Sequence, residues 1–469
     1  MLNFDYTNIQ QEVIGYENGI DIEFEFANYS QKIATIINDI NHQKKVHASN
    51  YRWLEYSPDN KIVQDILDYA NSVRGKFLNI VIVGIGAPIL GIRTLLDALL
   101  KPFWNSLDRD AKDNYPNIVF MGDIDPDNVA GITNFKNIDR SLFLIISQDG
   151  LNPDSMALFM LAKRRLEFEI GSKARENIVV CTQQTSLLRQ IAIQEGYKCF
   201  DVPETAIPRF SLFTSCGLVP LALFGIDIIA LLNGVKDFFE LSLNPSIYKN
   251  PAAQTSLFHY LLYKQKNKNI SVIMPYSTRL KCLPYWCTQV KAESLIKNHD
   301  NEGKYLPTGQ IPYATYGSGD QHSLLQMLTE GPNNKIINIL KVEKFDTDYV
   351  IPDYYDSTCA GYLSGKTLTN LIEIQINSIK TILTENKRPN ILITLPQISP
   401  YDLGQFMALY MINMPIQAAL YNINPFSHTR YENLQNYTFA QLGKYGYEET
   451  LKEYIEKNQK FSSLSVLPE

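Results

Sequence analysis

Hydrophobic and polar positions follow two periods along this chain. Short runs rich in Val and Ile lead into a turn marked by Gly or Pro, and then into a segment whose apolar residues recur at helical spacing. Two blocks of the chain repeat this rhythm, which is typical of parallel α/β proteins. The predicted strands carry few polar residues, so we expect each sheet to be covered on both faces by helices.

The pattern predicts the same kind of unit twice. In the first block we expect strands at 79–84, 117–121, 141–147 and 177–183, and helices at 89–100, 154–169 and 185–195. In the second block we expect strands at 270–276, 335–342 and 390–395, and helices at 283–297, 363–383 and 400–421. The predicted fold class is therefore α/β, with two mainly parallel sheets, each flanked by helices in three layers.

Length and turn signals predict how these units divide the chain. At roughly 150 residues per domain, the 469 residues allow two or three folded units. Asn-Pro pairs between 242 and 253 separate the two blocks. We expect a helical arm over 1–71, a first domain over 72–250, a second over 251–430 and a C-terminal helical segment over 431–469.

Composition narrows the class of protein. Hydrophobic residues make up 45% and charged residues 20%, which is a globular balance, and a net charge of −6 argues against nucleic acid as a partner. No apolar run approaches the roughly 20 residues of a membrane span, and the acidic first segment does not resemble a secretory signal. We therefore expect a cytoplasmic protein without membrane contact. The six scattered Cys residues are expected to be reduced thiols, with no metal site.

A glycine-rich turn is the sharpest local signal for a ligand. Gly84 and Gly86 stand between a predicted strand and a predicted helix, where backbone N–H groups can hold an anion. The next glycine, Gly91, lies too far along the chain for a dinucleotide-binding loop. A tight turn without a ligand explains the same residues equally well.

Five further positions are candidates for chemistry, and each also has an ordinary structural explanation. Ser147 leaves a strand just before a predicted helix, Arg209 lies between apolar groups, and Gln289 and Glu293 fall on one face of a helix. His322 follows a flexible Gly-Ser-Gly loop. Taken singly, a Glu or Arg is usually a surface residue, and a loop His is usually solvated.

Several motifs occur in a fixed order between residues 79 and 443. They are Gly84-Ile85-Gly86 with Leu90-Gly91, Arg209-Phe210-Ser211, Gly217-Leu218-Val219-Pro220, Met274-Pro275-Tyr276-Ser277-Thr278-Arg279, Ala292-Glu293-Ser294, Asp320-Gln321-His322-Ser323, Glu330-Gly331-Pro332 and Asn424-Pro425-Phe426. This order resembles the phosphoglucose isomerase family. The resemblance implies two sugar-isomerase (SIS) domains, a homodimer with shared active sites, and conversion of glucose 6-phosphate and fructose 6-phosphate through a cis-enediol.

The resemblance also implies a role for each candidate. Glu293 matches the carboxylate that moves a proton between C1 and C2, and Arg209 matches the guanidinium that stabilises the enediolate. His322 matches the ring-opening histidine that the family draws from the neighbouring subunit. Ser147, Gln289 and the backbone of Gly86 match positions that contact the sugar phosphate. Neither a metal nor an organic cofactor is implied.

Two departures from the family pattern leave three readings open. The loop that holds phosphate has become Ser147-Gln148-Asp149-Gly150-Leu151-Asn152, which places a carboxylate where a dianion would bind. The catalytic Lys near the C-terminus falls on Gln435, and Arg430 or Lys444 are the candidates to replace its charge. The chain is then a working isomerase with a rebuilt anion site, an inactive homologue that binds sugars or other proteins, or an isomerase of another sugar.

Overall fold

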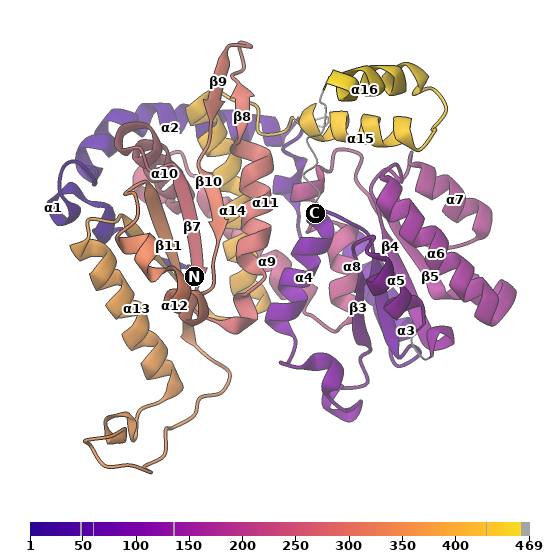
Figure 1. The fold of residues 1–469 in the computed structure, drawn as a ribbon, viewed down its shortest axis with the longest axis horizontal. Helices are drawn as coiled ribbons and strands as arrows, with labels where there is room; N and C mark the ends of the chain where they lie inside the picture. The colour runs from indigo at the N-terminus through magenta and orange to yellow at the C-terminus, as the bar shows by residue number, and fades with distance from the viewer. Residues whose placement is uncertain (47–48, 60, 135–136, 428, 461–469) are drawn as a thin grey trace, which may run out of the picture.

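Two lobes, each built around a five-stranded sheet, make up the molecule (Figure 1). The computed structural model describes residues 1–46, 49–59, 61–134, 137–427 and 429–460. The predicted α/β class with two mainly parallel sheets is confirmed. Within the described ranges, no helix is long and apolar enough to cross a lipid bilayer.

The first sheet is entirely parallel, with strand order β3-β2-β4-β5-β6. Its strands are β2 (Asn79–Val83), β3 (Asn117–Met121), β4 (Ser141–Ile146), β5 (Ile178–Gln183) and β6 (Lys198–Val202). The apolar runs predicted the first four. The fifth, β6, lies at the edge of the sheet and was missed because its sequence, Lys-Cys-Phe-Asp-Val, contains two charged residues and no continuous apolar run.

The second sheet has the order β1-β12-β11-β7-β10, and it is parallel except for β1, which runs antiparallel to β12. Its strands are β1 (Asn3–Asp5), β7 (Ile270–Pro275), β10 (Ile311–Ala314), β11 (Lys335–Lys344) and β12 (Asn390–Gln397). A separate hairpin pairs β8 (Lys297–His299) with β9 (Tyr305–Thr308). We expected only helical or irregular structure over 1–71, and β1 corrects that expectation.

Helices cover both faces of each sheet, as the apolar strands predicted. The α-helices of the described structure are α1 (Gln11–Ile14), α2 (Ile22–Lys44), α3 (Lys61–Val73), α4 (Ala87–Leu99), α5 (Pro126–Thr133), α6 (Pro153–Ile170), α7 (Leu187–Glu195), α8 (Ser215–Leu223), α9 (Ile228–Ser242), α10 (Pro251–Lys266), α11 (Leu283–Leu295), α12 (Gly317–Thr329), α13 (Leu368–Glu385), α14 (Pro400–Tyr421), α15 (Thr429–Gln441) and α16 (Glu448–Lys460). The last two, α15 and α16, pack on each other.

Alternate side chains of β2 pack into two different hydrophobic cores, one on each face of the sheet. Val81 and Val83 pack with α6 and α7 on one face, whereas Ile80 and Ile82 join the large core that continues into the second lobe. Both sets are buried, so every position of the strand loses its contact with water. This continuous core fixes one lobe against the other.

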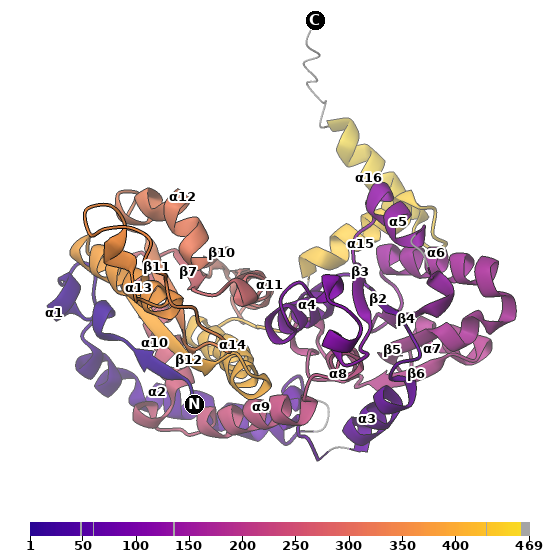
Figure 2. The same cartoon turned by 90° about the horizontal axis from the view of Figure 1, so that it is seen from below.

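Helices α4 and α11 meet where the lobes join (Figure 2). The first turn of α4, the loop that follows β4 and the C-terminal half of α11 face one cavity there. Gly91 of α4 packs closely on Leu212 and Trp286, where a Cβ atom would lie 2.9 Å from the leucine side chain. Gly91 therefore allows the two lobes to pack closely, and it is not part of a ligand-binding loop.

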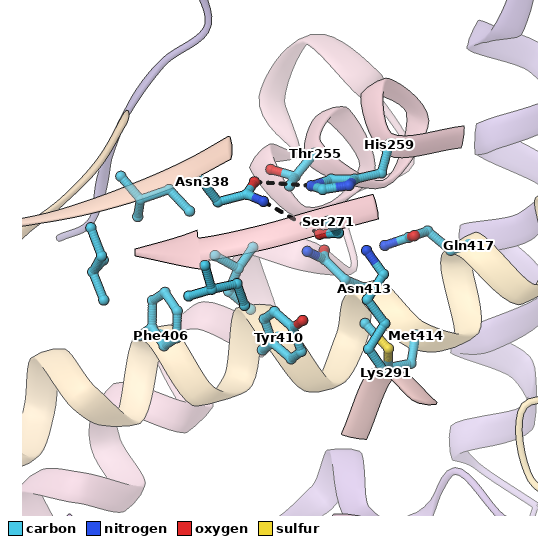
Figure 3. Close-up of a pocket in the computed structure, with 14 residues that line it drawn as sticks. Thr255, His259, Ser271, Lys291, Asn338, Phe406, Tyr410, Asn413, Met414 and Gln417 are labelled. Atoms are coloured by element: carbon cyan, nitrogen blue, oxygen red, sulfur yellow. Dashed lines mark hydrogen bonds between the residues drawn. The ribbon is translucent and has the colours of Figure 1, made fainter. Parts of the chain in front are cut away.

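A second, enclosed cavity of about 30 Å³ lies inside the second lobe, between β7, α10, α11 and α14 (Figure 3). Lys291 reaches into it and donates to Oε1 of Gln310 at 2.9 Å, an oxygen that also contacts His259 at 2.8 Å. Burial lowers the pKa of Lys291 to about 7. The hydroxyl of Tyr410 and Oε1 of Gln417 line the same cavity and have no hydrogen-bond partner in the described residues.

We expect Lys291→Met to stabilise the fold at neutral and acid pH. The ordinary lysine pKa of 10.5 falls to about 7 on folding, so the unfolded chain holds the extra proton between these values. The native protein is therefore penalised most below pH 7, and its stability rises with pH by up to about 1.4 kcal/mol per unit. Urea unfolding at pH 6, 8 and 10 should show a Met advantage that shrinks as pH rises. A pH-independent difference would contradict this.

Candidate active site

The junction of the two lobes holds an open cavity of about 680 Å³. Its wall combines the first turn of α4, the loop after β4, the end of α11, the β8-β9 hairpin and the segment leading into α15. The residues that line it include Gly86, Ser147, Gln148, Asp149, Asn152, Gln289, Glu293, Lys297, Ser427 and Gln435. Four of the sequence candidates, Gly86, Ser147, Gln289 and Glu293, thus lie on one wall.

Glu293 is held from both sides by polar neighbours. Gln289 lies one turn earlier on α11 and donates from Nε2 to Oε1 of Glu293 at 2.8 Å. Arg209 approaches the other carboxylate oxygen, with Nη1 at 3.4 Å from Oε2. The Glu293 side chain keeps 33% of its surface exposed, so an oriented carboxylate faces the cavity.

Arg209 lies in the short helix Pro208–Phe210 and is fully buried. Its Nε donates to Oγ of Ser294 at 2.9 Å, and its Nη2 donates to the carbonyl oxygen of Pro425. Burial lowers the pKa of Arg209 to about 10, and the neighbouring Glu293 opposes that shift. The guanidinium therefore stays charged at neutral pH, but protein atoms surround it and it does not line the cavity.

Gly86 begins helix α4 with a backbone conformation that suits glycine. Its φ of 93° lies in the left-handed region, which side-chain-bearing residues rarely adopt. The residue is the N-cap of α4, so the first N–H groups of the helix point toward the cavity end. Pro88 in the first turn removes one of those donors.

The loop after β4 satisfies its own N–H groups with its own side chains. Ser147 Oγ accepts from the N–H of Gly150 at 3.2 Å, and Asp149 Oδ1 accepts from Leu151 at 2.9 Å. Asn152 Oδ1 accepts from Ser155 and caps α6. The N–H of Leu151 thus already has a carboxylate as its acceptor.

Position 435 faces the same cavity, and the residue there is Gln. Lys444 lies elsewhere, because it is exposed and its Nζ stacks 3.6 Å from the ring centre of Phe439. The side chain of Arg430 is outside the described part of the structure. Neither alternative cation is therefore placed in the cavity.

Lys297 is the cation that the sequence analysis missed. It follows α11 directly and lines the cavity. Its Nζ donates to the carbonyl oxygens of Glu293 at 2.7 Å and Ser427 at 2.9 Å. The one available signal was its position one turn after Glu293, which is equally typical of a surface lysine at a helix end.

His322 is not brought to this cavity by the chain itself. It lies exposed on α12, a helix of the second lobe that packs on α13. Its neighbour Gln321 accepts a hydrogen bond from the Tyr276 hydroxyl at 2.8 Å, which fixes the start of α12. The catalytic role of His322 stays a prediction.

Comparison with known proteins gives this geometry a context. The family model described as phosphoglucose isomerase matches residues 66–433, well over half of the chain. The chain belongs to the phosphoglucose isomerase family. A glucose-6-phosphate isomerase of Rubrobacter xylanophilus is 31% identical, with 95% of this chain and 99% of that protein covered. One from Carboxydothermus hydrogenoformans is 28% identical, with 97% of each chain covered.

Solved structures agree on the fold. The crystal structure of a hypothetical protein from Thermus thermophilus matches with a TM-score of 0.84 at 25% identity, covering 94% of this chain and 100% of that one. A glucose-6-phosphate isomerase from Chlamydia trachomatis matches with a TM-score of 0.80 at 17% identity, covering 97% and 91%. The family and its two-sheet SIS architecture are thus confirmed, while the domain boundaries and the six site residues stay predictions.

We expect Arg209→Met to destabilise the protein strongly. The substitution leaves the Ser294 hydroxyl, the Pro425 carbonyl and Glu293 without their charged donor, and breaking a buried charged network costs about 3–5 kcal/mol. Arg93→Met is the matched control, because the Arg93 side chain is 55% exposed and its loss should cost less than about 1 kcal/mol. Urea unfolding of the three proteins measures both effects. Equal midpoints for the two variants would contradict the central role of Arg209.

Proposed function

We propose that this chain interconverts glucose 6-phosphate and fructose 6-phosphate through a cis-enediol, with Glu293 as the proton carrier. The observation that carries the proposal is the oriented, partly exposed Glu293 carboxylate in the cavity between the lobes. Membership of the phosphoglucose isomerase family supports the substrate class.

The contacts of Glu293 suit a base that acts on two neighbouring carbons. One oxygen is held by Gln289 and the other by Arg209, so the carboxylate keeps its orientation while its remaining lone pairs reach the cavity. Gly86 and Ser147 lie on the same wall, where the sugar or its phosphate would extend.

The proposal includes a homodimer in the cytoplasm. A histidine from a second copy would complete each cavity, because His322 of this copy is exposed and lies outside its own cavity wall. The family resemblance, rather than any contact of this chain, supports the dimer and the ring-opening role of that histidine.

A second candidate is a protein that binds sugars without turning them over. Two observations favour it. Asp149 bonds within the loop where the family holds phosphate, and Gln435 lines the cavity where the family has its catalytic Lys. Both changes make the charge of the site less positive. Together they would weaken phosphate binding and ring opening, and they would leave the Glu293 carboxylate unchanged.

We expect Glu293→Gln to abolish isomerisation while the fold survives. Glutamine keeps the size and the hydrogen-bonding oxygen but cannot accept the substrate proton, so kcat should fall by about 10³-fold or more. The measurement is coupled turnover of fructose 6-phosphate to glucose 6-phosphate by the purified protein and its variant. Absence of turnover in both, with thermal shifts from either sugar phosphate, would favour the sugar-binding alternative.

We expect Asp149→Ser to strengthen binding of the phosphorylated sugar. Removing the carboxylate frees the N–H of Leu151 and removes repulsion toward a dianion, so KM for fructose 6-phosphate should fall by about tenfold, or about 1.4 kcal/mol. Asp110→Ser is the matched control, because Asp110 is exposed and does not line the cavity. An unchanged KM in the Asp149 variant would mean that the ligand's phosphate does not bind at this loop.

A further inference from the structure

A buried lysine without an acidic neighbour lines the enclosed cavity of the second lobe (Figure 3). Lys291 is only 2% exposed, and its ammonium donates to Oε1 of Gln310 at 2.9 Å. An ammonium carries three N–H groups, so two remain for other acceptors within the described structure. Neither Asp nor Glu is among the described residues that line the cavity. The charge therefore lacks the anionic partner that a buried cation usually has.

The imidazole of His259, in the same cavity, faces two carbonyl oxygens. Its Nδ1 lies 2.8 Å from Oε1 of Gln310, and its Nε2 lies 3.1 Å from Oδ1 of Asn338. Both amides are held in this orientation, because their nitrogens donate at 2.8 Å to the carbonyl oxygens of Lys268 and Val272. Both ring contacts are hydrogen bonds only if each ring nitrogen carries a proton, which makes the imidazole a cation.

Burial opposes this second proton. It lowers the pKa of His259 to about 3, and the charge of Lys291 acts in the same direction. Burial also lowers the pKa of Lys291 to about 7, while Cys287 on the same helix opposes that shift. The hydrogen bonds thus favour a positively charged cavity, whereas the loss of solvent disfavours the charge. An anion beside the two side chains would reconcile these effects, because it raises the pKa of both.

Two side chains of α14 bring unused hydrogen-bonding atoms to the cavity. The Tyr410 hydroxyl and Oε1 of Gln417 are buried and have no hydrogen-bond partner among the described residues. In Figure 3, both side chains and that of Lys291 point toward strand β7. The hydroxyl can donate to an anion as it stands. No donor fixes Oε1 of Gln417, so rotation about the last side-chain bond can present Nε2 instead.

Size narrows the class of ligand. The cavity volume of about 30 Å³ suffices for roughly two water-sized spheres. A chloride ion fits this volume, whereas a sugar phosphate is too large. Water also fits, but a neutral molecule cannot offset the charge of a protonated lysine.

We propose that the enclosed cavity of the second lobe binds one chloride ion between the Lys291 ammonium and the Tyr410 hydroxyl, and that a proton is taken up with the ion. The site is separate from the cavity between the lobes, because the two share no lining residue. It therefore does not depend on the proposed isomerase function. The ion joins α14 to α11, the helix that also carries Glu293.

The test is thermal unfolding of the full chain at pH 6 in halide-free buffer, with sodium chloride or sodium gluconate added at equal ionic strength. Gluconate is too large for the cavity, so it controls for the screening of surface charges. We expect chloride to raise Tm saturably, by at least about 2 °C more than gluconate, because a ligand that binds only the native state stabilises it. Equal shifts from the two salts overturn the proposal.

Single substitutions connect the effect to the cavity. Lys291→Met should remove the chloride-specific rise in Tm, whereas Lys304→Met, at an exposed position outside the cavity lining, should keep it. Tyr410→Phe removes only a hydroxyl, so it should weaken the apparent Kd for chloride at least about threefold. A chloride-specific rise that persists in Lys291→Met overturns the proposal. Should that variant fail to fold, an unchanged Kd in Tyr410→Phe overturns it.

Proton uptake is tested by the pH dependence of the same titration. The titratable side chains around the site are Lys291 and Cys287 of α11, His259 of α10 and Tyr410 of α14, and β7, β11 and β12 add none to the described lining. Lys291 loses its charge above about pH 7 without the ion, so the apparent Kd should rise at least tenfold between pH 6 and pH 9. A Kd that does not change with pH overturns the proposal.

Bromide locates the ion directly. Crystals of the full chain grown with sodium bromide should show an anomalous scattering peak in the cavity, between Lys291 and Tyr410. Bromide at surface positions only, with water in the cavity, overturns the proposal and assigns the unpartnered groups to buried solvent.

Discussion

The buried guanidinium of Arg209 is the interaction on which the site depends. It joins three segments that are far apart in the chain, since it bonds to Ser294 and Glu293 on α11 and to the carbonyl of Pro425. A buried charge is tolerated only where its donors are satisfied, and here Arg209 of the first lobe finds these partners in the second lobe. The same contacts that make burial of the charge acceptable also orient the carboxylate in the cavity.

The two cations nearest Glu293 differ in their exposure to the cavity. Arg209 is fully buried behind the cavity wall, whereas Lys297 lines the wall itself. The loop after β4 shows the opposite tendency, because Asp149 satisfies a backbone donor with a negative charge. The charged side chains that line the cavity in the described structure are thus Asp149, Glu293 and Lys297, and the loop after β4 contributes no cation to the lining.

The sequence predicted the regular elements best where burial was complete. β3 and α14 have the predicted bounds, because their apolar residues continue to the turn or cap at each end. β10, with the sequence Ile-Pro-Tyr-Ala, is short and half exposed, so its pattern did not stand out from a loop. The helical spacing of Gln289 and Glu293 predicted their contact, but the burial of Arg209 depends on residues 85 and 216 positions away, which no local pattern encodes.

The pairing of β1 with β12 has a consequence for how the chain is made. Asn3 lies opposite Thr394, so the second sheet gains its edge strand only after nearly the whole polypeptide has left the ribosome. The first sheet needs only residues 79–202 and can form much earlier. Until β12 has been synthesised, β1 has no strand to pair with, because β12 forms the sheet edge that β1 covers. β1 therefore stays unpaired during most of the synthesis of the chain.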